Sequence, residues 1–170
     1  MKNYSVGHFS KNKFNQGFTL IELMVVVVIV AIFAAIAIPS YQHFIRRANV
    51  AQAQQEMSKI AEQLQRFKSR NFSFKGFNAK YLYPNSSIFD ASSQTLNFNS
   101  KYTITLVDNM AGNRLLVDSS ASGQGWSIKA ISKDTANYSL LLTSSGMHCK
   151  NITVDNIDYN SCGDAGSEGW

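Results

Sequence analysis

The hydrophobic and polar positions of the chain begin with a long apolar run. Between positions 18 and 38 only Thr19 and Glu22 are polar, and these 21 residues match the roughly 20 that an α-helix needs to cross a bilayer. The pattern therefore predicts a membrane-spanning helix close to the N-terminus.

A helical repeat continues beyond this run. Pro39 removes one backbone donor, so it should kink or loosen the helix rather than end it. Apolar side chains then recur at steps of three and four, with Gln, Glu and Lys between them: Val50, Ala53, Met57, Ile60, Ala61, Leu64 and Phe67. We expect one helix from Phe18 to about Arg70, roughly 80 Å long at 1.5 Å per residue, whose second half carries an apolar stripe.

The remainder of the chain is typical of strands and turns. Apolar and polar residues alternate at 102–106 and 126–130, and short apolar runs lie at 115–117 and 138–143. Turn-forming residues at 109–113 and 119–125 would connect them. The fold class is therefore α+β: a long N-terminal helix packed on an antiparallel sheet of about four strands.

Glu22 is unusual because it lies inside the apolar run. An acid there costs a few kcal/mol unless it is neutralised, so an intramembrane carboxylate indicates a functional site. No Lys or Arg occurs between Lys13 and Arg46. If the chain were cut after Gly17, however, the new α-amino group of Phe18 would lie four residues away and could pair with Glu22 in the same or a neighbouring chain.

The block GFTLIELMVVVVIVAIFAAIAIPSYQ, which begins at Gly17, resembles the N-terminal signature of type IV pilins and their pseudopilin relatives. The resemblance implies that a membrane-embedded prepilin peptidase cuts between Gly17 and Phe18 and methylates the Phe18 amine. It also implies an assembly role for Glu22 and a helix kink at Pro39. Other pilin subunits in a helical filament would be the partners, and the expected fold is the pilin fold.

Charge supports an exported domain. The segment 1–17 would be a cytoplasmic leader, because it holds three Lys and no acid, and positive residues stay inside. Its removal would lower the net charge from +5 to about +2. We expect four parts: the leader 1–17, a transmembrane and filament-core helix 18–38, an amphipathic helix 39–70 and a globular head 71–170. The protein would sit in the bacterial inner membrane with one span, and on the pilus at the cell surface after assembly.

The two cysteines, Cys149 and Cys162, fall in the part that would be exported to an oxidising compartment, where disulfides persist. With twelve residues between them, the bond would contribute about 3 kcal/mol. The pair also resembles the C-terminal disulfide of type IV pilins. Asp155 and Asp158 could hold calcium in principle, as in related secretion pseudopilins, but they lack an EF-hand pattern and suit a solvated loop.

No catalytic constellation is recognisable. The three histidines are not placed with a Ser or Asp in a nucleophile arrangement, and the chain has neither a phosphate-binding glycine loop nor an HExxH helix. We therefore expect a protein that is not an enzyme, with no metal and no cofactor.

One segment offers a binding chemistry. No acid lies between Glu62 and Asp90, whereas five cations lie there: Arg66, Lys68, Arg70, Lys75 and Lys80. Six aromatic residues are interleaved with them. Cations beside aromatic rings suit nucleic-acid phosphates and bases, and pilins of this kind serve DNA uptake. The alternative, which we favour on the charge run alone, is that several aromatics anchor a loop while the cations are solvated.

These observations favour a structural subunit of a type IV pilus, more specifically a minor pilin, used for adhesion, twitching motility or DNA uptake. The presence of Glu22 favours a subunit with others above it. Two alternatives remain open: a pseudopilin of a type II secretion system and a membrane-anchored binding protein that never polymerises. The expected disulfide favours the pilus, because major secretion pseudopilins use calcium in that region.

Overall fold

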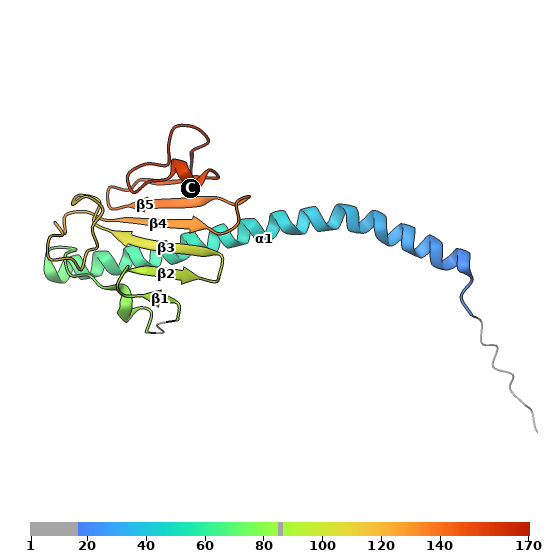
Figure 1. Cartoon of the computed structure of the whole chain (residues 1–170), viewed down its shortest axis with the longest axis horizontal. Coiled ribbons are helices and arrows are strands. Elements are labelled where there is room, and N and C mark those ends of the chain that lie inside the picture. Colours follow the sequence, from blue (N-terminus) through green and yellow to red (C-terminus); the bar gives the residue numbers. More distant parts are fainter. Residues whose placement is uncertain (1–16, 85–86) are drawn as a thin grey trace, which may run out of the picture. The chain divides into compact units, whose positions relative to one another are not determined.

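The computed structural model describes residues 17–84 and 87–170. The expected leader 1–17 lies outside the described residues except for Gly17. The chain divides into two compact units between Gln42 and His43. A single helix, α1 (Leu20–Asn71), contributes to both units (Figure 1). The predicted helix is thus confirmed, and Pro39 lies within it without ending it.

The first unit, as far as it is described, is helical from Leu20 onward. Thr19 starts the helix, because its Oγ1 accepts from the backbone N–H of Glu22 at 3.3 Å and its carbonyl from that of Leu23 at 3.2 Å. Nearly every side chain of residues 17–42 is exposed. The helix is long and apolar enough to cross a membrane, and none of the apolar window is buried within the protein.

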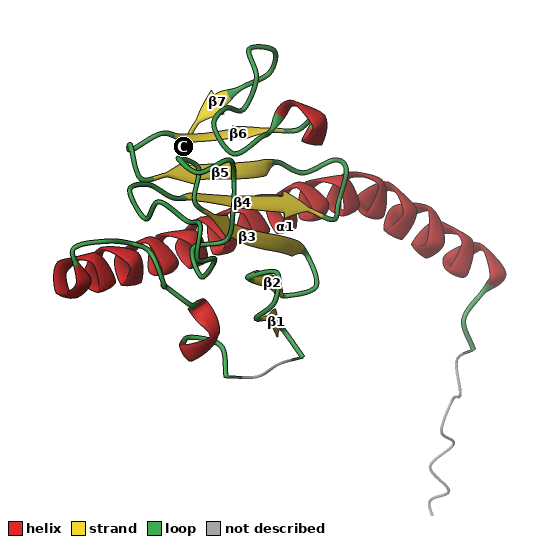
Figure 2. Ribbon diagram, turned by 60° about the vertical axis from the view of Figure 1, so that its left-hand side comes forward, coloured by secondary structure: helices red, strands yellow, loops and turns green. Residues whose placement is uncertain are grey.

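The second unit contains the rest of α1 and a seven-stranded antiparallel sheet in sequential order (Figure 2). The strands are β1 (Phe89–Asp90), β2 (Thr95–Phe98), β3 (Tyr102–Val107), β4 (Ser127–Ser132), β5 (Ser139–Thr143), β6 (His148–Asn151) and β7 (Glu168–Gly169). Two short 3₁₀ helices, η1 (Ala79–Tyr81) and η2 (Val154–Asn156), lie in the connections.

The sheet confirms the predicted layout but is larger than the four strands expected. β3, β4 and β5 fall on predicted segments, whereas β1, β2, β6 and β7 were not predicted. The strand expected at 115–117 is wrong. Its Leu116 is fully buried, but the chain turns there, since the N–H of Asp118 donates to the carbonyl of Leu115 at 3.0 Å.

The core lies between the sheet and the apolar stripe of α1. Ala53, Met57, Ile60 and Leu64 are buried against one face of the sheet, and Val50, Ala61 and Phe67 are partly buried beside them, as the helical period predicts. Cross-strand neighbours on that face complete the core, with Ile104 opposite Ala130 and Leu106 opposite Ile128. Packing on α1 therefore holds the head together.

The C-terminal segment covers part of the sheet through a second cluster: Leu141, Cys149, Ile157 and Cys162. Cys149 and Cys162 form a disulfide. The buried Asn151 amide donates to the carbonyls of Cys162 and Ala165, both at 2.8 Å. Asp158 Oδ1 accepts from the N–H groups of Asn160 and Ser161, both at 2.6 Å, so that carboxylate is used by its own loop.

Candidate functional site

The predicted processing residues precede the first turn of α1. Gly17 and Phe18 lie before the helix, both are exposed, and nothing lies within 4 Å of where a Cβ on Gly17 would be. Glu22 is in the first turn, where a carboxylate is favoured by the helix dipole. Within residues 17–84 and 87–170 its carboxylate has no ion pair. The described chain thus presents Glu22 without a partner of its own.

The predicted cations gather at the C-terminal end of α1 and in the loop after it. Arg66, Lys68 and Arg70 lie in the last turns of the helix, Lys75 follows in the loop, and Lys80 belongs to η1. All five are exposed. The structure therefore brings Arg66, Lys68, Arg70 and Lys75 to the end of α1 and the loop directly after it, and Lys80 follows in η1.

Three of these cations already have contacts within the chain. A guanidinium nitrogen of Arg66 lies 2.5 Å from a carboxylate oxygen of Glu62, one turn back. The Lys68 ammonium sits 4.6 Å from the centroid of the Phe74 ring. Lys75 Nζ donates to the carbonyl of Ser119 at 2.6 Å. Arg70 and Lys80 make no such side-chain contact in the described part of the chain.

A second loop joins this surface. The N–H of Phe74 donates to the carbonyl of Gly123 at 2.9 Å, and the N–H of Gly76 to that of Leu116 at 2.7 Å. Gly123 permits this approach, because a Cβ there would lie 2.2 Å from Ser73 Oγ and 2.6 Å from the backbone nitrogen of Lys75. The loop between β3 and β4 is thereby fixed beside the loop that follows α1 (Figure 1).

The second loop brings Arg114, which sequence reasoning missed. Arg114 is exposed and donates to Ser120 Oγ. The pKa of Asp118 is lowered, first by hydrogen bonds from Ser120 and then by the positive charges of Arg114 and Lys75. Both cations therefore lie near one carboxylate, though 39 residues separate them in sequence. Only the tertiary contact of the two loops could reveal this neighbour.

The six aromatic residues of the segment differ in burial, and Phe67 is partly buried against the core. Phe74, Phe77 and Tyr83 are buried in the core, which confirms the anchoring alternative for these three. Phe72 and Tyr81 are instead 90% and 58% exposed. Tyr81 lies beside a hollow of about 350 Å³ that is lined by Gln63, Arg66, Phe67, Arg70 and Asn71. The two exposed rings thus accompany the cations at the surface.

Phe72 is also held in a left-handed backbone conformation. Its φ is +57°, and its N–H donates to the carbonyl of Lys68 at 2.7 Å, which ends α1. A bulky residue in this region costs roughly 1–3 kcal/mol, and leaving the ring in water gains nothing by burial. The strained and exposed ring makes Phe72 a candidate for a contact outside the chain.

Two family models cover most of the chain. Residues 12–38 match the prokaryotic N-terminal methylation motif. Residues 39–153 match the model described as "Type IV minor pilin ComP, DNA uptake sequence receptor". The second match contains the basic end of α1, both loops and β1 to β6.

Similar curated proteins match over short stretches of 38 to 48 residues. A fimbrial protein of Moraxella nonliquefaciens is 60% identical over 38 residues, 22% of this chain and 25% of that protein. A fimbrial protein of Pseudomonas aeruginosa is 54% identical over 48 residues, 28% and 31% of the two chains. The type IV major fimbrial protein FimA of Dichelobacter nodosus is 53% identical over 45 residues, 26% and 29%. The chain thus spans less than a third of the length of these relatives, and no solved structure matches it.

Proposed function

The chain belongs to the type IV minor pilin family described as ComP, DNA uptake sequence receptor, and from this premise we propose that it is a pilus subunit that binds DNA at the end of α1. The family is one of structural pilins rather than enzymes. The surface we propose, called here the basic tip, consists of Arg66, Lys68, Arg70, Phe72, Lys75, Lys80, Tyr81 and Arg114.

The charge balance of the basic tip carries the proposal. Among the described residues, the carboxylates that pair with or lie beside its six cations are Glu62, next to Arg66, and Asp118, near Arg114 and Lys75. The Asp108 carboxylate in the same loop is buried and already accepts hydrogen bonds from Ser122 and the N–H of Gly123. Neutralising phosphates releases counterions from the duplex, which supplies most of the affinity of such a surface. An exposed cationic end on the head therefore suits a nucleic acid.

The exposed rings and guanidinium groups add recognition beyond charge. An Arg can donate two hydrogen bonds in a fixed geometry to a guanine edge in the major groove. The ammonium group of Lys75 or Lys80 can also contact a guanine, but its geometry is less selective. Arg70 and Arg114 are exposed and suited to this role. Phe72 supplies an apolar ring that can contact a thymine methyl or a base step. We assign phosphate positioning to the lysines and base reading to Arg70, Arg114 and Phe72.

Export and assembly complete the proposed function. Prepilin peptidase would remove the leader by cutting between Gly17 and Phe18 and would methylate the Phe18 amine. The segment 18–38 would hold the subunit in the inner membrane, with the head outside the cytoplasm, and later pack against the same segment of neighbouring pilins. The match to the methylation motif supports this sequence of events. The pilin and fimbrial relatives favour a pilus over a secretion pseudopilus.

DNA binding is tested with the full chain in detergent, using fluorescence anisotropy of labelled duplexes at several salt concentrations. Arg70→Gln should weaken binding, and the slope of log affinity against log salt should fall by about 1 if Arg70 contacts a phosphate. If Arg70 reads a base, discrimination against a wrong base pair should instead fall by about 1–3 kcal/mol. Phe72→Ala should reduce affinity without changing the salt slope.

A matched control uses Arg47→Gln, which removes one exposed cation elsewhere on α1. Arg47 lies 19 positions before Arg66 in the same helix, about 30 Å away at 1.5 Å per residue. Equal weakening by Arg47→Gln and Arg70→Gln would show that only net charge matters and would contradict the basic tip as the site.

A further inference from the structure

A second cationic feature of the head is a pocket at the other end of its part of α1. It has a volume of about 290 Å³ and lies between the helix, the turn that precedes β5 and the strand β6. Its lining combines cations with apolar surface: His43, Arg46, Arg47, Val50, Ala51, Gln54, Ala136, Asn137, Tyr138 and Lys150. The volume is near the lower end of the range for small-molecule sites, which starts at about 300 Å³.

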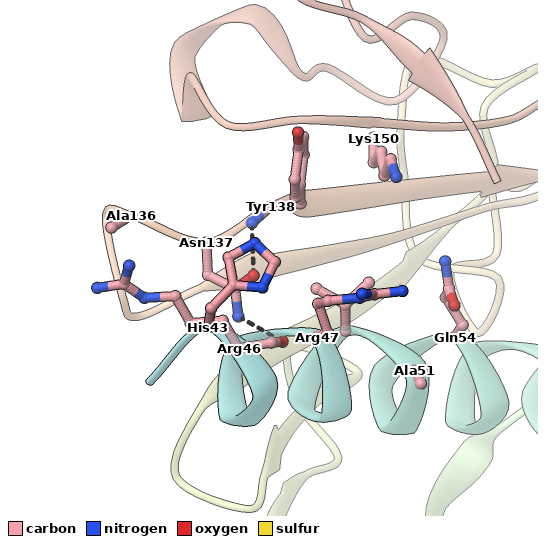
Figure 3. Close-up of a pocket in the computed structure, with 10 residues that line it drawn as sticks. His43, Arg46, Arg47, Ala51, Gln54, Ala136, Asn137, Tyr138 and Lys150 are labelled. Carbon is pink, nitrogen blue, oxygen red and sulfur yellow. Dashed lines mark hydrogen bonds between the residues drawn. The ribbon is translucent and has the colours of Figure 1, made fainter. Parts of the chain in front are cut away.

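The walls of this pocket are fixed by a buried amide. The side chain of Asn137, 3% exposed, donates to the carbonyl of Arg46 at 3.2 Å, and its oxygen accepts from the N–H of Tyr138 at 2.9 Å. These bonds tie the turn between β4 and β5 to α1 (Figure 3). The cavity is therefore built by the fold itself.

The cations of the pocket have unequal partners. Arg46 pairs with Asp134 at 3.1 Å, and Lys150 pairs with Glu168 at 3.1 Å. Hydrogen bonds from Lys150 and Tyr138 lower the pKa of Glu168, so that acid is ionised and offsets one cation. Arg47 has no carboxylate partner in the described part of the chain. Three permanent cations against two carboxylates leave one positive charge for a ligand.

The side chains present this charge beside apolar surface. Figure 3 shows Arg47 on the helical wall and Lys150 on the opposite strand wall, with the Tyr138 ring nearby. The Lys150 ammonium lies 4.7 Å from the centroid of that ring. Val50, Ala51 and Ala136 supply the apolar lining. A ligand with one negative charge and an adjoining aliphatic portion matches both properties.

The position of the pocket along the chain selects the source of such a ligand. His43 follows Ile38, the last residue of the apolar run, by five positions. In sequence, the helical wall of the pocket thus begins about one and a half helical turns after the apolar run ends, while the basic tip is some 30 Å farther along α1.

We propose that this pocket binds the phosphate diester of an anionic phospholipid, with Arg47 and Lys150 contacting the phosphate oxygens and the Tyr138 side wall receiving the glycerol portion. The bound lipid would hold the head against the membrane before assembly. This inference rests on the membrane anchoring in the proposed function and is independent of DNA binding.

The test measures which lipids the full chain retains in dodecyl maltoside, by native mass spectrometry with added phosphatidylglycerol or phosphatidylcholine. Phosphatidylglycerol should be retained at least about fivefold better, and Arg47→Gln should remove that preference, since one cation near an anionic lipid carries a factor of this size. Arg70→Gln, which removes a cation from the basic tip, should leave lipid retention unchanged.

Several outcomes would overturn the proposal. Equal retention of the two lipids, or an unchanged preference in Arg47→Gln, would exclude an anionic-lipid site. Competition by inorganic phosphate at concentrations equal to the lipid would show a free-phosphate site. Displacement of phosphatidylglycerol by a short DNA duplex would assign the pocket to nucleic acid. A chain absent from the membrane fraction of cells would refute the anchoring itself, which separates that failure from a failure of lipid selectivity.

Discussion

The two parts of α1 share one secondary structure but differ in what surrounds them. In residues 20–38 the helix is apolar on all sides apart from Glu22, and nearly all side chains of residues 20–42 are exposed. In residues 43–71 it carries one apolar stripe, and Ala53, Met57, Ile60 and Leu64 on that stripe are buried in the head. The second part finds its partner within the chain, whereas the first requires lipid or other subunits.

The glutamates of the helix show the same difference. Glu56, in the second part, accepts from the Tyr83 hydroxyl and pairs with Lys59 at 3.0 Å. Glu22, in the first part, has no ion pair among the residues that the structure describes. A buried charge is tolerated only when it is paired. The contrast agrees with our proposal that the partner of Glu22 is supplied by assembly.

The largest effect is expected at Glu22. Glu22→Ala should be processed normally but enter filaments at least tenfold less, because it would leave the Phe18 amine of a neighbour unpaired in an apolar core, at a cost of about 3–5 kcal/mol. The measurement compares the protein in sheared filaments and in whole cells, with retraction blocked. Gly17→Ala is the control for the earlier step and should accumulate as uncut precursor. Normal incorporation of Glu22→Ala would remove the proposed assembly role.

Two leucines, one in each part of the helix, test how much each part contributes to the stability of the head. Leu64 is fully buried, so Leu64→Ala should lower the free energy of unfolding of the head by about 2–5 kcal/mol. Leu23 is 60% exposed, so Leu23→Ala should leave it unchanged. Urea unfolding of the full chain in detergent, followed by tryptophan fluorescence, reports on Trp126 and Trp170, both in the head.

Leu64→Met provides the milder variant if Leu64→Ala does not fold, and it should cost less than about 1.5 kcal/mol. Equal losses in Leu23→Ala and Leu64→Ala would mean that the head depends on the first part of the helix. The division of α1 into a self-sufficient and a partner-dependent part would then be wrong.

The helix could be predicted well from the sequence because its apolar pattern continues over a long segment. The stripe from Val50 to Phe67 covers several turns, so each buried position supports the others. β3, β4 and β5 were found for the same reason, since each alternates or forms a continuous apolar run.

Three of the four missed strands lack such a period, whereas β2 (Thr-Leu-Asn-Phe) alternates but over only four residues. β1 and β7 have two residues each, and β6 reads His-Cys-Lys-Asn, with its buried Asn151 satisfied by carbonyls of the C-terminal loop. The residues 115–117 form a short apolar run that predicts a strand, although only Leu116 of the three is buried. Burial at one loop position and burial along a strand look alike over three residues.

The candidate site was predictable in part. The five cations between Glu62 and Asp90 are close together in sequence, so the local charge pattern alone indicated them. Arg114 and the Arg47 pocket depend on tertiary contacts through Gly123 and Asn137, respectively, which leave no local pattern. The exposed state of Phe72 could not be separated from the buried state of Phe74 by their identical residue type.

The smallest expected effect concerns the contact between Tyr83 and Glu56 in the second part of the helix. Burial, and then the hydrogen bond and negative charge of Glu56, raise the pKa of Tyr83 above its ordinary value. A raised pKa means that the folded chain holds the phenol proton more tightly than the unfolded chain. This contribution is complete below the unfolded pKa of about 10 and is lost as the pH rises above it.

Wild-type stability should therefore fall above about pH 10, with a slope of up to about 1.4 kcal/mol per pH unit from this group. Tyr83→Phe should make that fall shallower while lowering stability at neutral pH by about 1 kcal/mol through the lost hydrogen bond. Burial also raises the pKa of Tyr102 to about 12, so part of the alkaline loss should remain in the variant. Tyr41→Phe, which removes a phenol that is 66% exposed in the first part of α1, is the control. If Tyr83→Phe leaves the fall of stability above pH 10 unchanged, the contact between Tyr83 and Glu56 does not stabilise the head. Glu56 would then not differ from Glu22 in having a stabilising partner within the chain.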